Sequence, residues 1–255
     1  MNAPGAAAEH MLLLLKIGRA EVSWPFGLVR LPSEPRDRRL SGMAFQGIPA
    51  EAFGFYERLE ADNSRSFWDE HSSDYQVYVR EPIRALVGEL EAEFGSATVF
   101  RPHRDIRFST DKSPYKTYQG AFVERLPGTG WYVQVSADGL MVSGGFHSHA
   151  PDQVERYRAA VDSGRSGSQL VAIVAGLSDG GLSIGGDRLK TRPRGVPADH
   201  PRIELLRHRS LTAGHDWPAG PLLCDQAALG LVRQAWQKLV PLIDWLCEHV
   251  GPPDS

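Results

Sequence analysis

Three short, largely apolar segments most constrain how this chain folds. They cover residues 120–124, 131–136 and 140–146, and the dipeptides Pro127-Gly128 and Asp138-Gly139 separate them. Glycine-containing tight turns between such short segments are typical of consecutive antiparallel strands. The sequence therefore predicts a β-meander in the middle of the chain, and residues 98–108 have the pattern of one or two strands before it.

Helices are predicted on both sides of this meander. Apolar residues recur at helical spacing from Pro49, after the Asp62-Asn63-Ser64 break, and over residues 74–94, 152–161, 169–176, 200–207 and 224–250. Pro82 is expected to kink or split the helix over 74–94. Helices, then strands adjacent in sequence, then helices indicate an α+β fold, in which the helices before and after an antiparallel meander sheet pack against it.

One domain is predicted, because single hydrophobic cores grow to about 250–300 residues and the chain has 255. Residues 1–42 contain several prolines and no periodic apolar pattern. We expect them to be a disordered or spurious N-terminal extension, with Met43 as an alternative start. Residues 43–250 then form the α+β domain, and residues 251–255 form a C-terminal tail.

Composition narrows the class of protein. A net charge of −3 argues against nucleic acid as a partner of the whole molecule, so any basic site must be local. The two cysteines have no metal-ligand spacing, which favours a reducing cytosol. No apolar run reaches the ~18 residues that a membrane span requires. We therefore expect a cytoplasmic protein without a membrane partner; the sequence leaves its oligomeric state open.

The densest cluster of charge is residues 101–116, which read R-P-H-R-D-I-R-F-S-T-D-K-S-P-Y-K. Strand alternation would place Arg101, His103, Asp105 and Arg107 on one face of a strand. Guanidinium groups present fixed donors that match the oxygens of carboxylates and phosphates. The segment is therefore a candidate anion site, and the alternative is an ion-pair network that only holds a sheet edge to a helix.

Roles follow from the chemistry of these side chains. Asp105 would orient an arginine or act as a general base, and Tyr115 would donate its hydroxyl. The candidate anion-binding residues are Arg101, Arg104, Arg107, Lys112 and Lys116.

A second basic cluster lies at residues 188–194, where cations alternate at strand spacing. Lys190 from this cluster is expected to complete the anion site, and a solvated edge strand is the alternative interpretation. No metal is predicted, because His147 and His149 lack a convincing third ligand beyond Asp152. The glycine pairs match neither a P-loop nor a dinucleotide fingerprint, so the sequence leaves any cofactor unknown.

The chain resembles a bacterial and fungal family, domain-of-unknown-function family 2461. The family signature R-x-x-R-D-x-R-F followed by K-x-x-Y stands here as Arg101, Arg104-Asp105, Arg107-Phe108, Lys112 and Tyr115. The resemblance covers residues 43–250, with further matching positions at Asn63, Phe67-Trp68, Tyr75, Gly144-Gly145, Leu189-Lys190, Pro193, Gly195 and Asp199-His200-Pro201. The aromatic pair at 67–68 stands in the reverse of the family order. The resemblance implies a fold unit and a set of important residues, but the family carries no established activity.

Three functional hypotheses remain open. The leading one is binding of, and catalysis on, a phosphate-bearing or other anionic small molecule by the segment 101–116, which leaves open whether the protein is an enzyme. The second is a non-catalytic module whose basic face docks an acidic protein or nucleic acid. The third is a purely structural ion-pair network.

Overall fold

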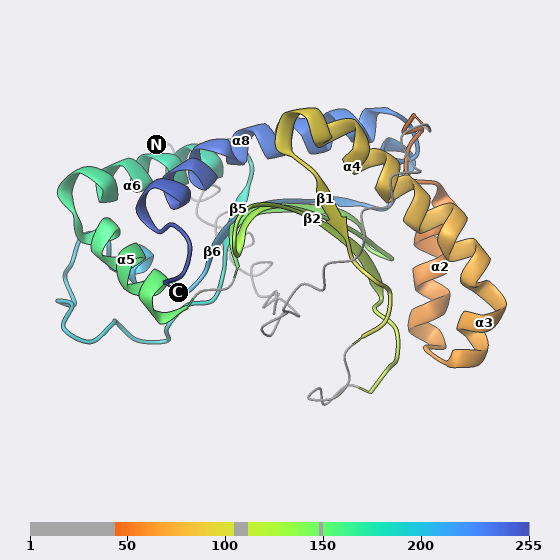
Figure 1. The fold of residues 1–255 in the computed structure, drawn as a ribbon, viewed down its shortest axis with the longest axis horizontal. Coiled ribbons are helices and arrows are strands. Elements are labelled where there is room, and N and C mark those ends of the chain that lie inside the picture. Colours follow the sequence, from red (N-terminus) through yellow and green to blue (C-terminus); the bar gives the residue numbers. More distant parts are fainter. Residues whose placement is uncertain (1–43, 105–111, 148–149, 255) are drawn as a thin grey trace, which may run out of the picture. The chain divides into compact units, whose positions relative to one another are not determined.

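The computed structural model describes residues 44–104, 112–147 and 150–254. Its centre is a six-stranded antiparallel sheet in the order β1-β2-β3-β4-β6-β5 (Figure 1). The strands are β1 (Ala97–Val99), β2 (Tyr118–Leu126), β3 (Thr129–Ser136), β4 (Gly139–Phe146), β5 (Ser183–Gly185) and β6 (Leu211–Pro218). The predicted meander is confirmed as β2, β3 and β4, and so is the α+β class.

Two strands at the far edge of the sheet escaped prediction. β6 pairs with β4 along its whole length, from Gly139↔Pro218 to Phe146↔Leu211. Its sequence contains glycine, aspartate and proline, which are depleted in strands, so its alternation is weak. β5 lies within the glycine-rich connection that precedes residue 187. Residues 189–194, which have strand spacing, form no strand.

The helices follow the predicted pattern closely. They are α2 (Ala50–Ala61), α3 (Arg65–Asp74), the π-helix η1 (Tyr75–Arg80), α4 (Glu81–Phe94), α5 (Pro151–Asp162), α6 (Gly164–Asp179), α7 (Ile203–Leu206), the 3₁₀ turn η2 (Pro221–Leu223) and α8 (Ala227–His249). Ser64 caps α3 by accepting a hydrogen bond from the Phe67 amide at 3.2 Å. Gly95 ends α4 with a positive φ of 103°.

Pro82 divides the long helical stretch in an unexpected way. It lies in the first turn of α4, where a missing N–H is tolerated. The preceding six residues widen into the π-helix η1. Wide turns of this kind are rare and recur at functional sites. None of the helices among the described residues is long and apolar enough to cross a bilayer.

The core lies between the sheet and α8. This helix contacts β2, β3, β4 and β6, and Figure 1 shows α8 and α4 along the same face of the sheet. Trp236 of α8 is fully buried and donates its indole hydrogen to the Tyr132 carbonyl at 3.2 Å. In return, Trp131 donates to the Trp236 carbonyl at 3.0 Å. The two bonds satisfy both buried indoles and fix α8 over β3.

Gly144 of β4 faces α8 and tests this packing. A Cβ atom there would lie 2.9 Å from Leu239 Cδ1 and 3.3 Å from Ile243 Cδ1. We expect Gly144→Val to lower the free energy of unfolding by about 1–3 kcal/mol, because overpacking forces neighbours out of their positions. Urea unfolding followed by tryptophan fluorescence measures this.

The matched control is Gly88→Ala in α4. A Cβ atom at Gly88 meets no atom within 4 Å. Alanine should therefore raise stability by up to about 1 kcal/mol through helix propensity. A stabilising effect of Gly144→Val would contradict the packing described here.

Candidate functional site

The basic segment forms a small extension of the sheet beyond β1 and β2. His103 and Tyr115 make an antiparallel bridge, with Arg104 N donating to Pro114 O at 2.9 Å and Lys116 N donating to Pro102 O at 2.8 Å. Because directly opposed residues of an antiparallel pair project to the same side, the side chains of His103 and Tyr115 lie on one side of this extension. Of the one or two strands predicted over residues 98–108, the described residues form β1 (Ala97–Val99) and this bridge.

Asn63, between α2 and α3, attaches this extension to the helices. Its side-chain amide donates to Tyr115 O at 3.0 Å, and its carbonyl oxygen accepts from Tyr115 N at 3.1 Å. One asparagine therefore satisfies both backbone groups of Tyr115. The position of the basic segment is set by a residue 52 positions earlier in the chain.

Aromatic packing supports the same attachment. Tyr115 is 5% exposed, and its ring stacks on Trp68 of α3 with centroids 4.3 Å apart and planes inclined by 10°. His103 lies beside both rings, 5.2 Å from Tyr115. Burial raises the pKa of Tyr115, and the charge of Asp69 acts in the same direction, so the phenol stays protonated at neutral pH.

A buried hydrogen-bond chain fixes the residue that precedes the basic segment. Tyr75 of η1 is fully buried and donates to Gln119 Oε1. Gln119 in turn donates to Phe100 O at 2.9 Å and to Gly120 O at 2.8 Å. Burial raises the pKa of Tyr75 to about 12, so it remains a donor. The main chain entering Arg101 is thus held against η1.

A cleft of about 530 Å³ lies between the helices and the basic segment. It is lined by Trp68, Ser72, Ser73, Gln76, Arg80, Arg101, Pro102 and His103. None of the described residues that line it is acidic. The Nε atom of Arg80 is buried and makes no hydrogen bond within the described part of the chain. A buried donor of this kind calls for a partner.

The polar side chains of the helical wall lie on one side of the helix because of their spacing in the sequence. Ser72, Gln76 and Arg80 succeed one another at intervals of four residues, so they follow one side of the α3–η1 helix. Arg80 is the last residue of η1. The wall therefore presents a hydroxyl, an amide and a guanidinium in a row facing Arg101 and His103.

Lys116 and Arg104 form a further group of cations, which lies near Arg101 of the cleft. Lys116 Nζ lies 5.3 Å from the centroid of the Phe100 ring. Burial, together with the smaller effect of the charges of Arg101 and Arg104, lowers the pKa of Lys116 to about 8. Burial also raises the pKa of Tyr118 to about 12, against the opposing charge of Arg104. These groups are therefore close enough to act on one another.

The structure gathers only some of the predicted site residues. Arg101 lines the cleft, Tyr115 is packed behind it, and Arg104 and Lys116 form the neighbouring cluster. Lys112 is exposed. Asp105 and Arg107 lie outside the described residues, as do residues 1–42, so the predictions made for them stay predictions.

Lys190 is placed apart from this group. It follows β5, which stands at the opposite edge of the sheet from β1. Its side chain is exposed, and its carbonyl accepts a hydrogen bond from Arg207 at 3.0 Å. The strand that was expected to carry it towards Arg104 is not formed, so the structure does not bring Lys190 to the cleft.

Sequence reasoning missed the helical wall, namely Ser72, Ser73, Gln76 and Arg80. The available signal was the family resemblance upstream of the signature, because its positions Trp68 and Tyr75 lie on the same stretch of helix as this wall. Polar residues on a predicted helix are otherwise taken as a solvated face.

His147 and His149 were considered as metal ligands, and the described residues around them form no metal site. His147 is half-buried, desolvation lowers its pKa to about 4, and its ring packs edge-on against Phe122 with centroids 4.8 Å apart. His149 lies outside the described residues. Asp152 pairs with Arg156 at 3.0 Å. Within the described ranges no three histidine, cysteine or carboxylate residues are grouped to hold a metal ion.

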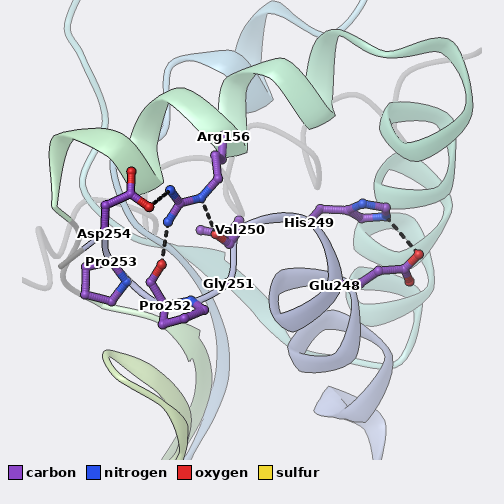
Figure 2. Close-up of a pocket in the computed structure, with 8 residues that line it drawn as sticks. All are labelled: Arg156, Glu248, His249, Val250, Gly251, Pro252, Pro253 and Asp254. Carbon is purple, nitrogen blue, oxygen red and sulfur yellow. Dashed lines mark hydrogen bonds and ion pairs between the residues drawn. The ribbon is translucent and has the colours of Figure 1, made fainter.

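A second depression, of about 440 Å³, lies at the end of α8 and is shown in Figure 2. Arg156 of α5 points into it, but its guanidinium is already engaged. It donates to Val250 O at 2.6 Å and pairs with Asp254 at 3.0 Å. This arginine holds the C-terminal residues against α5, in contrast to Arg80, whose Nε has no such partner.

Comparison with protein-family models identifies the family of this chain. A family model described as "Conserved hypothetical protein (DUF2461)" matches residues 51–245. These residues include the α3–η1 wall and the whole basic segment. No curated protein matches the sequence.

The Asn63 attachment predicts a measurable loss of stability. We expect Asn63→Ala to lower the free energy of unfolding by about 1–3 kcal/mol, because it leaves both backbone groups of Tyr115 without partners. The control is Gln46→Ala, which removes two exposed hydrogen bonds, one donated to Ala44 O and one accepted from Gln226, and should cost under about 0.5 kcal/mol. Equal losses in chemical unfolding would contradict the role of Asn63.

The lowered pKa of Lys116 predicts a pH dependence of stability. In the folded state this lysine loses its proton near pH 8, whereas its ordinary value is 10.5. Between these values the unfolded chain binds more protons, so the contribution of Lys116 to stability rises with pH. The difference between the unfolding free energies of the native protein and Lys116→Met should therefore shift in favour of the native protein as the pH rises from 8 to 10. A difference that stays constant would contradict this environment.

Proposed function

We propose that this chain, which belongs to the DUF2461 family of conserved hypothetical proteins, binds a small molecule carrying a phosphate or carboxylate group. The binding site is the cleft between the α3–η1 helix and residues 101–103. The observation that carries the proposal is the pair of guanidinium groups, Arg80 and Arg101, that line one cleft without an acidic residue among its described walls.

The donors of the cleft suit an oxyanion. Arg80 supplies a buried Nε–H that makes no hydrogen bond with the described residues, and Arg101 supplies an exposed guanidinium. Ser72 and Ser73 add hydroxyl groups that donate or accept. Hydrogen bonds between a guanidinium and an ionised oxygen are among the strongest in proteins. An anion would therefore satisfy Arg80 and balance Arg101 at once.

The size of the cleft favours a small molecule over a macromolecule. Its volume of about 530 Å³ lies within the ~300–1,000 Å³ of small-molecule sites. Nucleic-acid binding draws on many phosphate contacts along an extended basic surface. The net charge of −3 offers no such general attraction. A docking module for nucleic acid is accordingly the weaker proposal.

A catalytic role for this segment is supported by the sequence alone. Asp105 as orienter or base, and Arg107 as an anion ligand, follow from the signature alone. Tyr115 has a protonated hydroxyl, but its ring is committed to the stack with Trp68. We therefore propose binding as the function of the cleft and assign Tyr115 to its supporting wall.

Calorimetric titration with pyrophosphate, citrate, adenosine monophosphate and glucose 6-phosphate tests the proposal. At least one of these anions should bind the native protein. Arg80→Gln and Arg101→Gln should each weaken that binding about 10- to 100-fold, since a hydrogen bond to a charged group contributes about 1.5–3 kcal/mol. The matched control is Arg165→Gln, which removes an exposed arginine from α6 and should leave the affinity unchanged.

Two outcomes would overturn the proposal. One is binding that Arg80→Gln and Arg101→Gln leave intact. The other is binding of a single-stranded oligonucleotide alone, with affinity falling steeply as salt rises, since release of many counterions marks a nucleic-acid partner.

A further inference from the structure

The cleft has two chemically different ends. Trp68 of α3 lines it together with His103, and the centroids of their rings lie 6.0 Å apart. Arg80, the last residue of η1, lines it as well. About three helical turns separate Trp68 from Arg80 along the α3–η1 helix. One end of the cleft is therefore aromatic and the other end is cationic.

The basic segment runs between these two ends. His103 lies at the aromatic end, and Arg101 precedes it by two residues. The main chain just before Arg101 is held by Gln119, which donates to Phe100 O at 2.9 Å and accepts a hydrogen bond from Tyr75 of η1. The segment thus enters the cleft next to η1 and reaches the rings of α3 at His103. Arg101 therefore belongs to the η1 side of the cleft.

The aromatic end leaves ring surface uncovered. Tyr115 stacks on one face of Trp68, yet Trp68 is only half-buried, and His103 is exposed. Aromatic side chains pack favourably against other rings in offset or edge-to-face arrangements. Every nucleic-acid base presents a planar π-face to such side chains. A flat heteroaromatic group is therefore the ligand part that this end accepts best.

The wall between the two ends is polar and uncharged. Ser72, Ser73 and Gln76 line the cleft at sequence positions between Trp68 and Arg80. Hydroxyl and amide groups both donate and accept hydrogen bonds, so they suit neutral hydroxyl groups of a ligand. Along its length the cleft therefore changes from rings to neutral polar groups and then to guanidinium groups.

We propose that the ligand of this cleft is a nucleoside monophosphate. Its base packs against Trp68 and His103, its ribose hydroxyl groups face the neutral polar wall, and its phosphate is bound at the cationic end. The volume of about 530 Å³ is that of a site for one small molecule. The inference rests on the proposed function, because it names the class of anion that the cleft binds.

Calorimetric titration of the full chain with three probes tests the inference. Adenosine monophosphate carries both the base and the phosphate, ribose 5-phosphate lacks the base, and adenosine lacks the phosphate. We expect adenosine monophosphate to bind about 5- to 100-fold more tightly than ribose 5-phosphate, as stacking of one base on aromatic side chains provides. Adenosine should bind more weakly than adenosine monophosphate, because it leaves the guanidinium groups without an anion.

Substitutions at the two ends should act differently. Arg101→Gln should weaken adenosine monophosphate and ribose 5-phosphate by the same factor, because both carry the phosphate. His103→Ala should weaken adenosine monophosphate about 2- to 10-fold and leave ribose 5-phosphate unchanged. The matched variant His103→Phe keeps a ring and should keep the preference for the nucleotide. Trp68 is left in place, because its stack on Tyr115 also positions the basic segment.

Equal affinities for adenosine monophosphate and ribose 5-phosphate would overturn the inference, as would adenosine binding as tightly as its monophosphate. Binding of citrate or pyrophosphate without binding of adenosine monophosphate would also overturn it, while the proposed function would stand. If none of these anions binds, the proposed function fails and the inference fails with it. The two failures are therefore distinguishable.

Discussion

Packing of α8 on one face of the sheet is the constraint on which the rest of the structure depends. The reciprocal hydrogen bonds of Trp131 and Trp236 leave no polar indole atom unpaired in the most apolar part of the molecule. Because α8 contacts β2, β3, β4 and β6, it fixes which side chains of the meander face inward. The face of the sheet that α8 covers is buried in the core. Binding chemistry is therefore left to the edge, where the chain continues past β1 and enters β2.

At that edge the α2–η1 helices hold the basic segment in place. Asn63 pairs with the Tyr115 backbone, Trp68 stacks on its ring, and Tyr75 fixes Gln119. None of these contacts neutralises a charge. Hydrogen bonding and aromatic packing thus position several cations close together. The repulsion between these cations opposes folding, and the contacts that position them do not offset it. Local arrangements that oppose stability in this way are expected where a protein binds or reacts.

The sequence predicted those parts of the fold whose signals are local. The turns at Pro127-Gly128 and Asp138-Gly139 defined the meander, and helical spacing located most helices. β6 was missed because its stability comes from pairing with β4, about 70 residues earlier, rather than from its own residues. Arg101 was found by its place in a dense basic segment. Arg80 was not, because its importance comes from the π-turn of η1 and from a partner segment that is distant in sequence.

The cleft and Lys116 are linked through Arg101. This arginine lines the cleft and also lowers the pKa of Lys116 by its charge. An anion bound to Arg101 would offset part of that charge, and the pKa of Lys116 would then rise towards its ordinary value. Linkage requires the reverse as well, so protonated Lys116 strengthens anion binding and the free amine weakens it. The proton on Lys116 and an anion in the cleft are in this way coupled through one shared cation, Arg101.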